Sequence, residues 1–220
     1  SERQWAEDQG LVGCEFTATW DSARALIDAG VPFTLTTSWT GGAHLQAVVG
    51  YDELRGSLLI RDPFKRIHGE FDASGLFEAQ RSTGPRGMLL LPAAEAHRVE
   101  GIDLPETALW NGYHRVMTAL KIHDREAAKA AAGALEAEAP AHRLSISARR
   151  ALAMYDGDET AILKANDELL ALFPQDGNLQ LSKAASLSLL ASRAEQVDWL
   201  APLATPANAE PLTLVRYGQL

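Results

Sequence analysis

The chain has 220 residues, of which 46% are hydrophobic and 22% charged, a composition typical of one large globular domain or two small ones. Its formal net charge of -9, with no basic block to offset it, argues against a nucleic-acid partner. The single cysteine excludes an intrachain disulfide and a cysteine-rich zinc site, and no apolar run approaches the roughly 20 residues of a membrane segment. These limits favour a soluble protein, cytoplasmic rather than secreted, and leave the compartment open.

The first hundred residues are predicted to form a β-rich domain. A first helix is expected to end at Gly10. A second begins at residues 20–22 and ends at Gly30, and a third spans residues 72–80. Strands are expected at 11–19, 33–38, 44–51, 57–61, 64–71 and 87–91. The last of these is almost continuously apolar, which indicates a strand inside a sheet rather than at its edge.

From Pro105 onward the sequence is rich in Ala and Leu, with helical periodicity and almost no strand signal. Helices are expected at 106–123, 125–138, 141–155, 159–172, 178–192 and 195–203, with a partial one from 210. The breaks at Pro140 and Pro174 lie about 34 residues apart, which is the tetratricopeptide period of one helix pair per repeat. Because the chain ends inside a helix of the next unit, we expect the repeats to continue beyond Leu220.

Residues 41–63 are predicted to form a β-hairpin that carries the candidate chemistry. Two runs of strong β-formers flank the polar turn 52–56, and Asp62-Pro63 ends the second arm. His44 stands at the start of the first arm and Asp62 just past the end of the second, so antiparallel pairing brings them side by side. In a nucleophilic enzyme a carboxylate in this position fixes the tautomer of the histidine and stabilises its imidazolium.

The pattern His-x-x-x-Val-Val-Gly-Tyr-Asp, followed by a strand and Asp-Pro, resembles the second half of the papain-like bacteriocin-processing cysteine peptidases, which remove double-glycine leaders. The resemblance runs from about Glu7 to Pro92. It implies that His44 is the catalytic base and Asp62 its orienter, and it suggests a bacterial protein. In that family the nucleophilic cysteine and an oxyanion-hole glutamine lie upstream on a helical half, so we expect the nucleophile to come from outside this chain.

The remaining chemistry-bearing residues are assigned ordinary structural roles. Cys14 lies in an expected strand rather than at a helix N-terminus, which favours a small buried apolar residue over a nucleophile. The other histidines show no ligand spacing, so neither a metal site nor a cofactor is expected. They are His68, His97, His114, His123 and His142.

The sequence therefore predicts an α+β protein. Residues 1–100 form the antiparallel β half of a papain-like peptidase, and residues 101–220 form tetratricopeptide-like helical repeats. The favoured function is cleavage of a peptide or protein substrate, with a protein partner bound by the repeats. Two alternatives stay open: a catalytically inactive scaffold or peptide-binding protein, and an acyl or amide transferase on the same fold.

Overall fold

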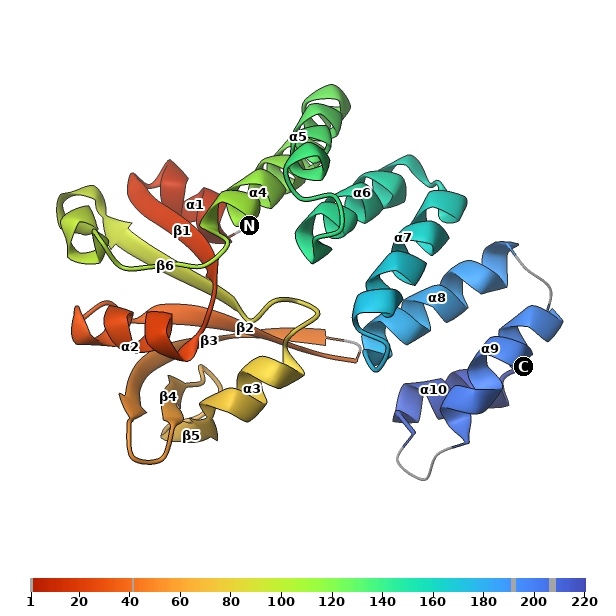
Figure 1. The fold of residues 1–220 in the computed structure, drawn as a ribbon, viewed down its shortest axis with the longest axis horizontal. Helices are drawn as coiled ribbons and strands as arrows, with labels where there is room; N and C mark the ends of the chain where they lie inside the picture. The colour runs from red at the N-terminus through yellow and green to blue at the C-terminus, as the bar shows by residue number, and fades with distance from the viewer. Residues whose placement is uncertain (1, 41, 191–192, 206–208) are drawn as a thin grey trace. The chain divides into compact units, whose positions relative to one another are not determined.

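A computed structural model describes residues 2–40, 42–190, 193–205 and 209–220. The chain divides into two compact units. The first takes in the residues up to Ser38 and Gly42–His114, and the second takes in Arg115–Leu220 with the short segment from Trp39. The division falls inside helix α4 (Thr107–Lys121). A β-sheet unit followed by a series of helices confirms the α+β class (Figure 1).

The first unit is built on a six-stranded antiparallel sheet with strand order β1-β6-β2-β3-β4-β5 (Figure 1). Strand β6 lies between β1 and β2, in the interior position that its apolar sequence predicts. The helices of this unit are α1, α2, the short α3, a 3-10 helix after β6 and the first part of α4. In chain order the elements are α1 (Glu2–Asp8), β1 (Leu11–Thr17), α2 (Trp20–Asp28), β2 (Phe33–Trp39), β3 (Gly42–Asp52), β4 (Ser57–Arg61), β5 (His68–Asp72), α3 (Ala73–Ala79), β6 (Arg86–Pro92) and the 3-10 helix Ala93–Val99.

One face of the sheet carries the hydrophobic core of this unit. Alternate residues of the strands point into it, so that Leu35, Val48, Ile60 and Leu89 are fully buried. Helix α2 covers this face with its apolar side, and burying its Leu26 alone contributes about 1.5–3 kcal/mol to the free energy of folding. Helix α3 adds Ala73, Leu76 and Phe77 to the same cluster.

The hairpin of β3 and β4 has a defined register with one irregularity. Ala47 pairs with Arg61 and Val48 with Ile60, and the register then shifts by one residue at a bulge between Val48 and Gly50. Continued by one pair past the end of β4, the same register sets Gln46 opposite Asp62. Because side chains alternate along a strand, His44 and Gln46 lie on the same face as the buried Val48.

The strand expected at 64–71 is shorter than predicted, because β5 begins only at His68. Residues 63–67 form a turn instead. The carboxylate of Asp62 accepts a hydrogen bond from the backbone N–H of Phe64 over 2.8 Å, and Nη1 of Arg61 donates to the carbonyl of Arg66 over 3.1 Å. These bonds satisfy backbone groups locally, so that the chain turns before it pairs with β4.

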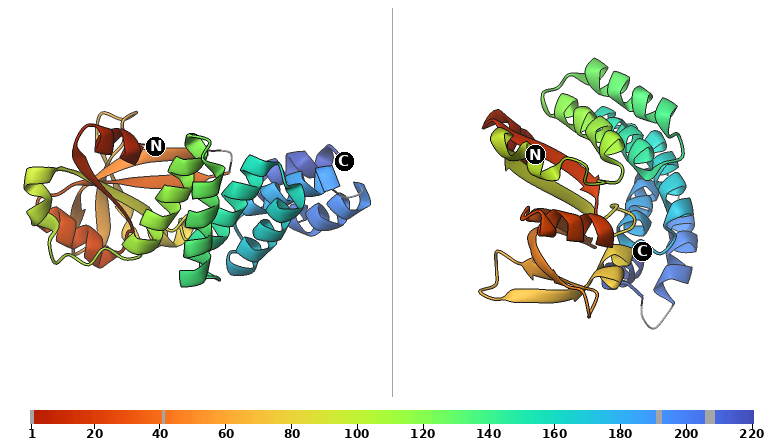
Figure 2. Two further views of the ribbon diagram at one scale, coloured as in Figure 1. Left: turned by 90° about the horizontal axis from the view of Figure 1, so that it is seen from above. Right: turned by 60° about the vertical axis from the view of Figure 1, so that its left-hand side comes forward.

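The second unit is a series of helices whose starts recur every 34 residues. The helices are α5 (Arg125–Glu138), α6 (Arg143–Asp156), α7 (Glu159–Leu172), α8 (Gly177–Leu190), α9 (Arg193–Ala204) and α10 (Pro211–Gly218). The starts of α5, α7 and α9 are spaced by 34 residues, as are those of α6, α8 and α10. The expected helix 178–192 reaches residues 191–192, which lie outside the described residues. Figure 2 shows successive helices of this unit packed side by side.

The helix starts recur because the residues that cap them recur. The carboxylate of Asp124 accepts from the backbone N–H of Ala127 at the start of α5, and Asp158 caps α7 in the same way through Ala161, each over 3.0 Å. Asp176 and Glu210 form a second pair 34 residues apart, at the starts of α8 and α10. A carboxylate at the N-cap satisfies free N–H groups and complements the helix dipole, so this spacing sets the spacing of the helices.

Candidate functional site

His44 and Asp62 meet at the end of the β3–β4 hairpin. Nε2 of His44 lies 3.1 Å from Oδ1 of Asp62, which is hydrogen-bond distance. The side chains of His44 and Asp62 are 16% and 14% exposed. The hairpin produces this contact as the sequence predicts, because its antiparallel register brings the start of one arm beside the end of the other.

The carboxylate of Asp62 accepts from three donors, which fix both of its oxygens. Oδ1 accepts from the backbone N–H of Phe64 as well as facing His44, and Oδ2 accepts from Nε2 of Gln46 over 3.2 Å. The Phe64 N–H lowers the pKa of Asp62 most, and the contacts with His44 and Gln46 lower it further, against the opposing effect of desolvation. Asp62 is therefore ionised at neutral pH.

An ionised Asp62 determines which nitrogen of His44 carries the proton. A carboxylate can only accept hydrogen bonds, so Nε2 must be the donor and neutral His44 carries its proton there. This leaves Nδ1 as the basic nitrogen, and no hydrogen bond within the described residues involves it. An imidazole with one nitrogen held by a carboxylate and the other unbonded has the form of a general base.

Phe64 and Gln46 complete the surroundings of the pair, and the sequence interpretation missed both. The ring of Phe64 stacks on the imidazole, and Gln46 stands two residues after His44 on the same face of β3. Gln46 lies opposite Asp62 when the ladder is extended by one pair, whereas Phe64 lies in the turn that follows Asp62. Extending the hairpin register by one pair was the signal that could have found Gln46.

Cys14 does not reach this site. It lies in β1, and strands β6 and β2 separate β1 from β3, so three strand spacings of about 4.8 Å put it about 14 Å away across the sheet. Partial burial against the core raises the pKa of its thiol above the ordinary value. Cys14 is therefore a poor nucleophile and is not a partner of His44.

The other histidines do not join the site or form a metal site. His68 lies exposed on β5, one strand further from β3 than Asp62. His114 is buried beside Glu7 and Glu15, with burial lowering the pKa of its imidazole. In the part of the chain that the structure describes, no group of three or more His, Cys, Asp or Glu side chains could hold a metal ion.

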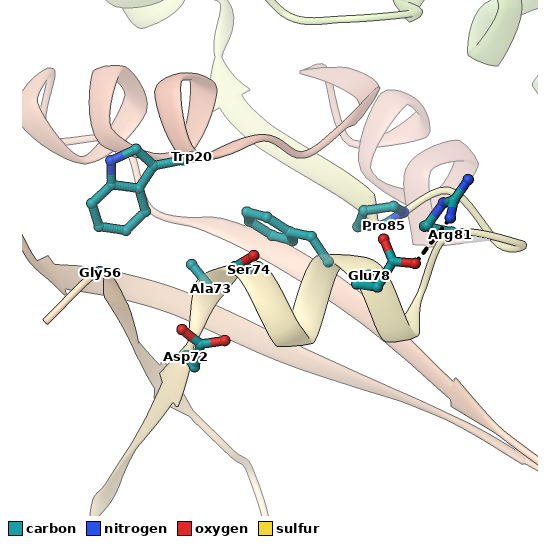
Figure 3. A pocket seen from close by; sticks show the side chains of 9 residues that line it. Trp20, Gly56, Asp72, Ala73, Ser74, Glu78, Arg81 and Pro85 are labelled. Carbon is teal, nitrogen blue, oxygen red and sulfur yellow. Dashed lines mark hydrogen bonds and ion pairs between the residues drawn. The ribbon is translucent and has the colours of Figure 1, made fainter.

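Described residues of the first unit line a pocket on each face of the sheet. The larger has a volume of about 560 Å³ and opens between the start of α2 and helix α3 (Figure 3). Trp20 and Phe77 contribute apolar rings to its lining. Figure 3 shows the indole of Trp20 at one end and the ion pair of Glu78 with Arg81 at the other. This size and lining suit an apolar side chain or a small ligand.

The smaller pocket, about 240 Å³, is lined in part by His44. Its walls include Thr36, Arg86 and Met88, which alternate along their strands with the core residues Leu35 and Leu89. By this alternation they lie on the face opposite to the core, whereas the imidazole shares the face of Val48.

Residues 1–78 match the family model described as the Peptidase_C39 like family, and this match supports a cysteine peptidase-like fold for the first unit. The match spans 78 of the 220 residues, contains both His44 and Asp62, and supports the peptidase part of the expected resemblance. It includes no residue of helices α4 to α10. A search of the curated proteins gave no match to this chain.

Among the described residues, no helix is both long enough and apolar enough to cross a bilayer.

Proposed function

We propose that the first unit is the base-carrying half of a papain-like cysteine peptidase acting on a peptide or protein substrate. The observation that carries this proposal is the 3.1 Å contact of His44 Nε2 with Asp62 Oδ1, which leaves Nδ1 as an unbonded base. His44 takes the proton of an attacking thiol and returns it to the leaving amine, and Asp62 holds the ring in the required tautomer.

The nucleophile in this proposal comes from outside these 220 residues. Cys14 is the only cysteine among them, and it lies three strands away with a thiol whose pKa is raised. In this proposal a thiol on another segment or another chain approaches Nδ1 of His44. Attack on the peptide carbonyl forms a thioester and releases the amine, and water then hydrolyses the thioester.

Labelling with a thiol-reactive peptide electrophile tests the base role. In the full-length protein, together with any partner chain that supplies the thiol, the label is expected on a cysteine other than Cys14. His44→Ala should abolish this labelling, while Cys14→Ser should leave it unchanged. Labelling that is insensitive to His44, or that is confined to Cys14, would contradict the proposal.

A non-catalytic peptide-binding function is the second candidate, and the larger pocket favours it. The apolar walls of Trp20 and Phe77 suit an apolar peptide side chain whether or not a thiol is present. On this interpretation a peptide binds to the full-length protein without labelling any cysteine. Substituting Ala73, which lines the pocket and is 3% exposed, with a larger residue should then weaken peptide binding.

We propose further that the helical unit forms tetratricopeptide-like repeats that bind a protein partner or the leader of the substrate. The 34-residue recurrence of helix starts and caps supports this, because stacked helix pairs present an extended binding surface. A photocrosslinking residue at Met154 or Leu189, which are 57% and 69% exposed, should give discrete crosslinked species in cells. The matched control is Leu54, fully exposed in the β3–β4 turn. Crosslinks from Leu54 alone would argue against this role.

A further inference from the structure

Gln46 makes a contact with Asp62 that complements that of His44. Its Nε2 donates to Oδ2 over 3.2 Å, while His44 faces Oδ1 over 3.1 Å. Because an ionised carboxylate cannot donate, the amide of Gln46 must turn its NH₂ group toward Asp62. The two donors thus approach the carboxylate from the same strand, two residues apart and on the same face.

The hydrogen bond from Gln46 restricts the rotation of the Asp62 carboxylate. The terminal torsion of an aspartate side chain is soft, so one hydrogen bond at Oδ1 leaves the group free to turn about its Cβ–Cγ bond. The second donor at Oδ2 opposes this rotation, and the Phe64 N–H at Oδ1 opposes it further. Held at both oxygens, the carboxylate presents Oδ1 to Nε2 of His44 in one orientation.

We propose that Gln46 is a positioning residue of the His44–Asp62 pair, holding Oδ2 of Asp62 so that Oδ1 stays aligned with Nε2 of His44. Gln46 acts only through Asp62. The catalytic consequence rests on the base role proposed above for His44, whereas the effect on Asp62 and on the tautomer of His44 does not.

The experiment compares two variants of Gln46 with a matched control. Gln46→Met keeps the length of the side chain and removes the donor. Gln46→Glu keeps the shape and puts a second carboxylate against Asp62. The control is Gln4→Met, because Gln4 donates to Asp8 over 3.0 Å in a similar glutamine–aspartate bond on α1.

Two NMR readouts report positioning without any need for activity. The carboxyl carbon of Asp62 reports its pKa, and the ring nitrogens of neutral His44 report the ratio of its two tautomers. Gln46→Met should raise the pKa of Asp62 toward its ordinary value, because the Gln46 contact lowers it in the native protein. It should also increase the share of the Nδ1–H tautomer several-fold. Gln46→Glu should raise the pKa of Asp62 further, because two adjacent carboxylates repel each other, and Gln4→Met should change neither the pKa of Asp62 nor the tautomer ratio of His44.

An unchanged Asp62 pKa and tautomer ratio in both folded Gln46 variants would overturn the inference. A Gln46→Glu variant that folds keeps the test valid even if Gln46→Met does not fold.

Electrophile labelling separates this inference from the proposed base role. If labelling requires His44, Gln46→Met should slow it by about tenfold, the effect of losing one hydrogen bond to a charged group. Labelling that ignores His44, together with the NMR changes, would overturn the base role and support positioning. Labelling that requires His44, without the NMR changes, would overturn positioning alone.

Discussion

Phe64 stacks on His44, with ring centroids 5.1 Å apart and 16° between the ring planes. Phe64 itself is 87% exposed, so the stacked ring buries little of its own surface. We expect the ring to limit the access of water to the His44–Asp62 hydrogen bond on the side where it stacks. In a low-dielectric environment such a bond is stronger than it is in water.

Removing this ring should affect the pair and leave the fold almost unchanged. In Phe64→Ala, hydrogen exchange at Nε2 of His44 should become several-fold faster, because water gains access to the bond with Asp62. The free energy of unfolding should change by less than about 0.5 kcal/mol, as is usual for an exposed residue. NMR exchange and denaturant titration measure the two effects. Phe64→Tyr, which keeps the stacked ring, should retain slow exchange, and equal exchange rates in Phe64→Ala and the native protein would contradict the shielding role.

Asp62 should contribute a pH-dependent term to the stability of the first unit. Its pKa is lowered in the folded state, chiefly by the Phe64 N–H, so the folded protein binds the Asp62 proton less tightly than the unfolded chain does. The contribution is complete above the unfolded pKa, near 3.8, and is lost as the pH falls through the lower folded value. Asp62→Asn should therefore be less stable than the native protein at pH 7, and the difference in stability should shrink as the pH falls below the unfolded pKa. Urea titrations at several pH values measure the difference in unfolding free energy between the two proteins. A difference that does not change with pH would contradict a stabilising role for the Asp62 charge.

The hairpin and the pair were predictable because their signals are local. Strong β-formers, a Gly-containing turn and Asp-Pro fix two arms, and antiparallel geometry then brings His44 to Asp62 without further information. The 34-residue period of the helices was predictable for a similar reason, since Pro140 and Pro174 mark equivalent breaks in successive helix pairs.

Gln46 and Phe64 could not be assigned in the same way, because their roles depend on the register of the ladder. Only the pairing of Val48 with Ile60 places Gln46 opposite Asp62, and the bulge next to Val48 changes the count of residues along β3. The strand expected from residue 64 failed because β propensity at Phe64 gave way to the turn that the Asp62 carboxylate stabilises. Propensity is a weak guide where a side chain competes for backbone donors.

The start of α5 and the end of α6 are joined by an ion pair that should depend on salt. Nε and Nη2 of Arg125 contact the two carboxylate oxygens of Asp156 over 2.7 Å each, and Arg125 lowers the pKa of Asp156. Lysine cannot reproduce this two-point geometry, so Arg125→Lys should lower the melting temperature slightly. Because the pair is exposed, 1 M salt should remove most of the difference in melting temperature between Arg125→Lys and the native protein. Differential scanning calorimetry at two salt concentrations measures it, and a difference that persists in high salt would contradict an electrostatic origin.

Two glycines of the helical unit should respond in opposite directions to the same substitution. Gly157 follows α6 with a φ of 68°, in the left-handed region, and Gly133 lies inside helix α5. A Cβ atom at either position would meet no other atom within 4 Å, so backbone conformation alone decides the outcome. Gly157→Ala should destabilise the protein by about 1 kcal/mol, because left-handed φ is unfavourable for alanine. Gly133→Ala should stabilise it by up to about 1 kcal/mol, through helix propensity. Chemical denaturation of the two variants measures both changes, and the same sign for both would show that packing rather than backbone conformation governs these positions.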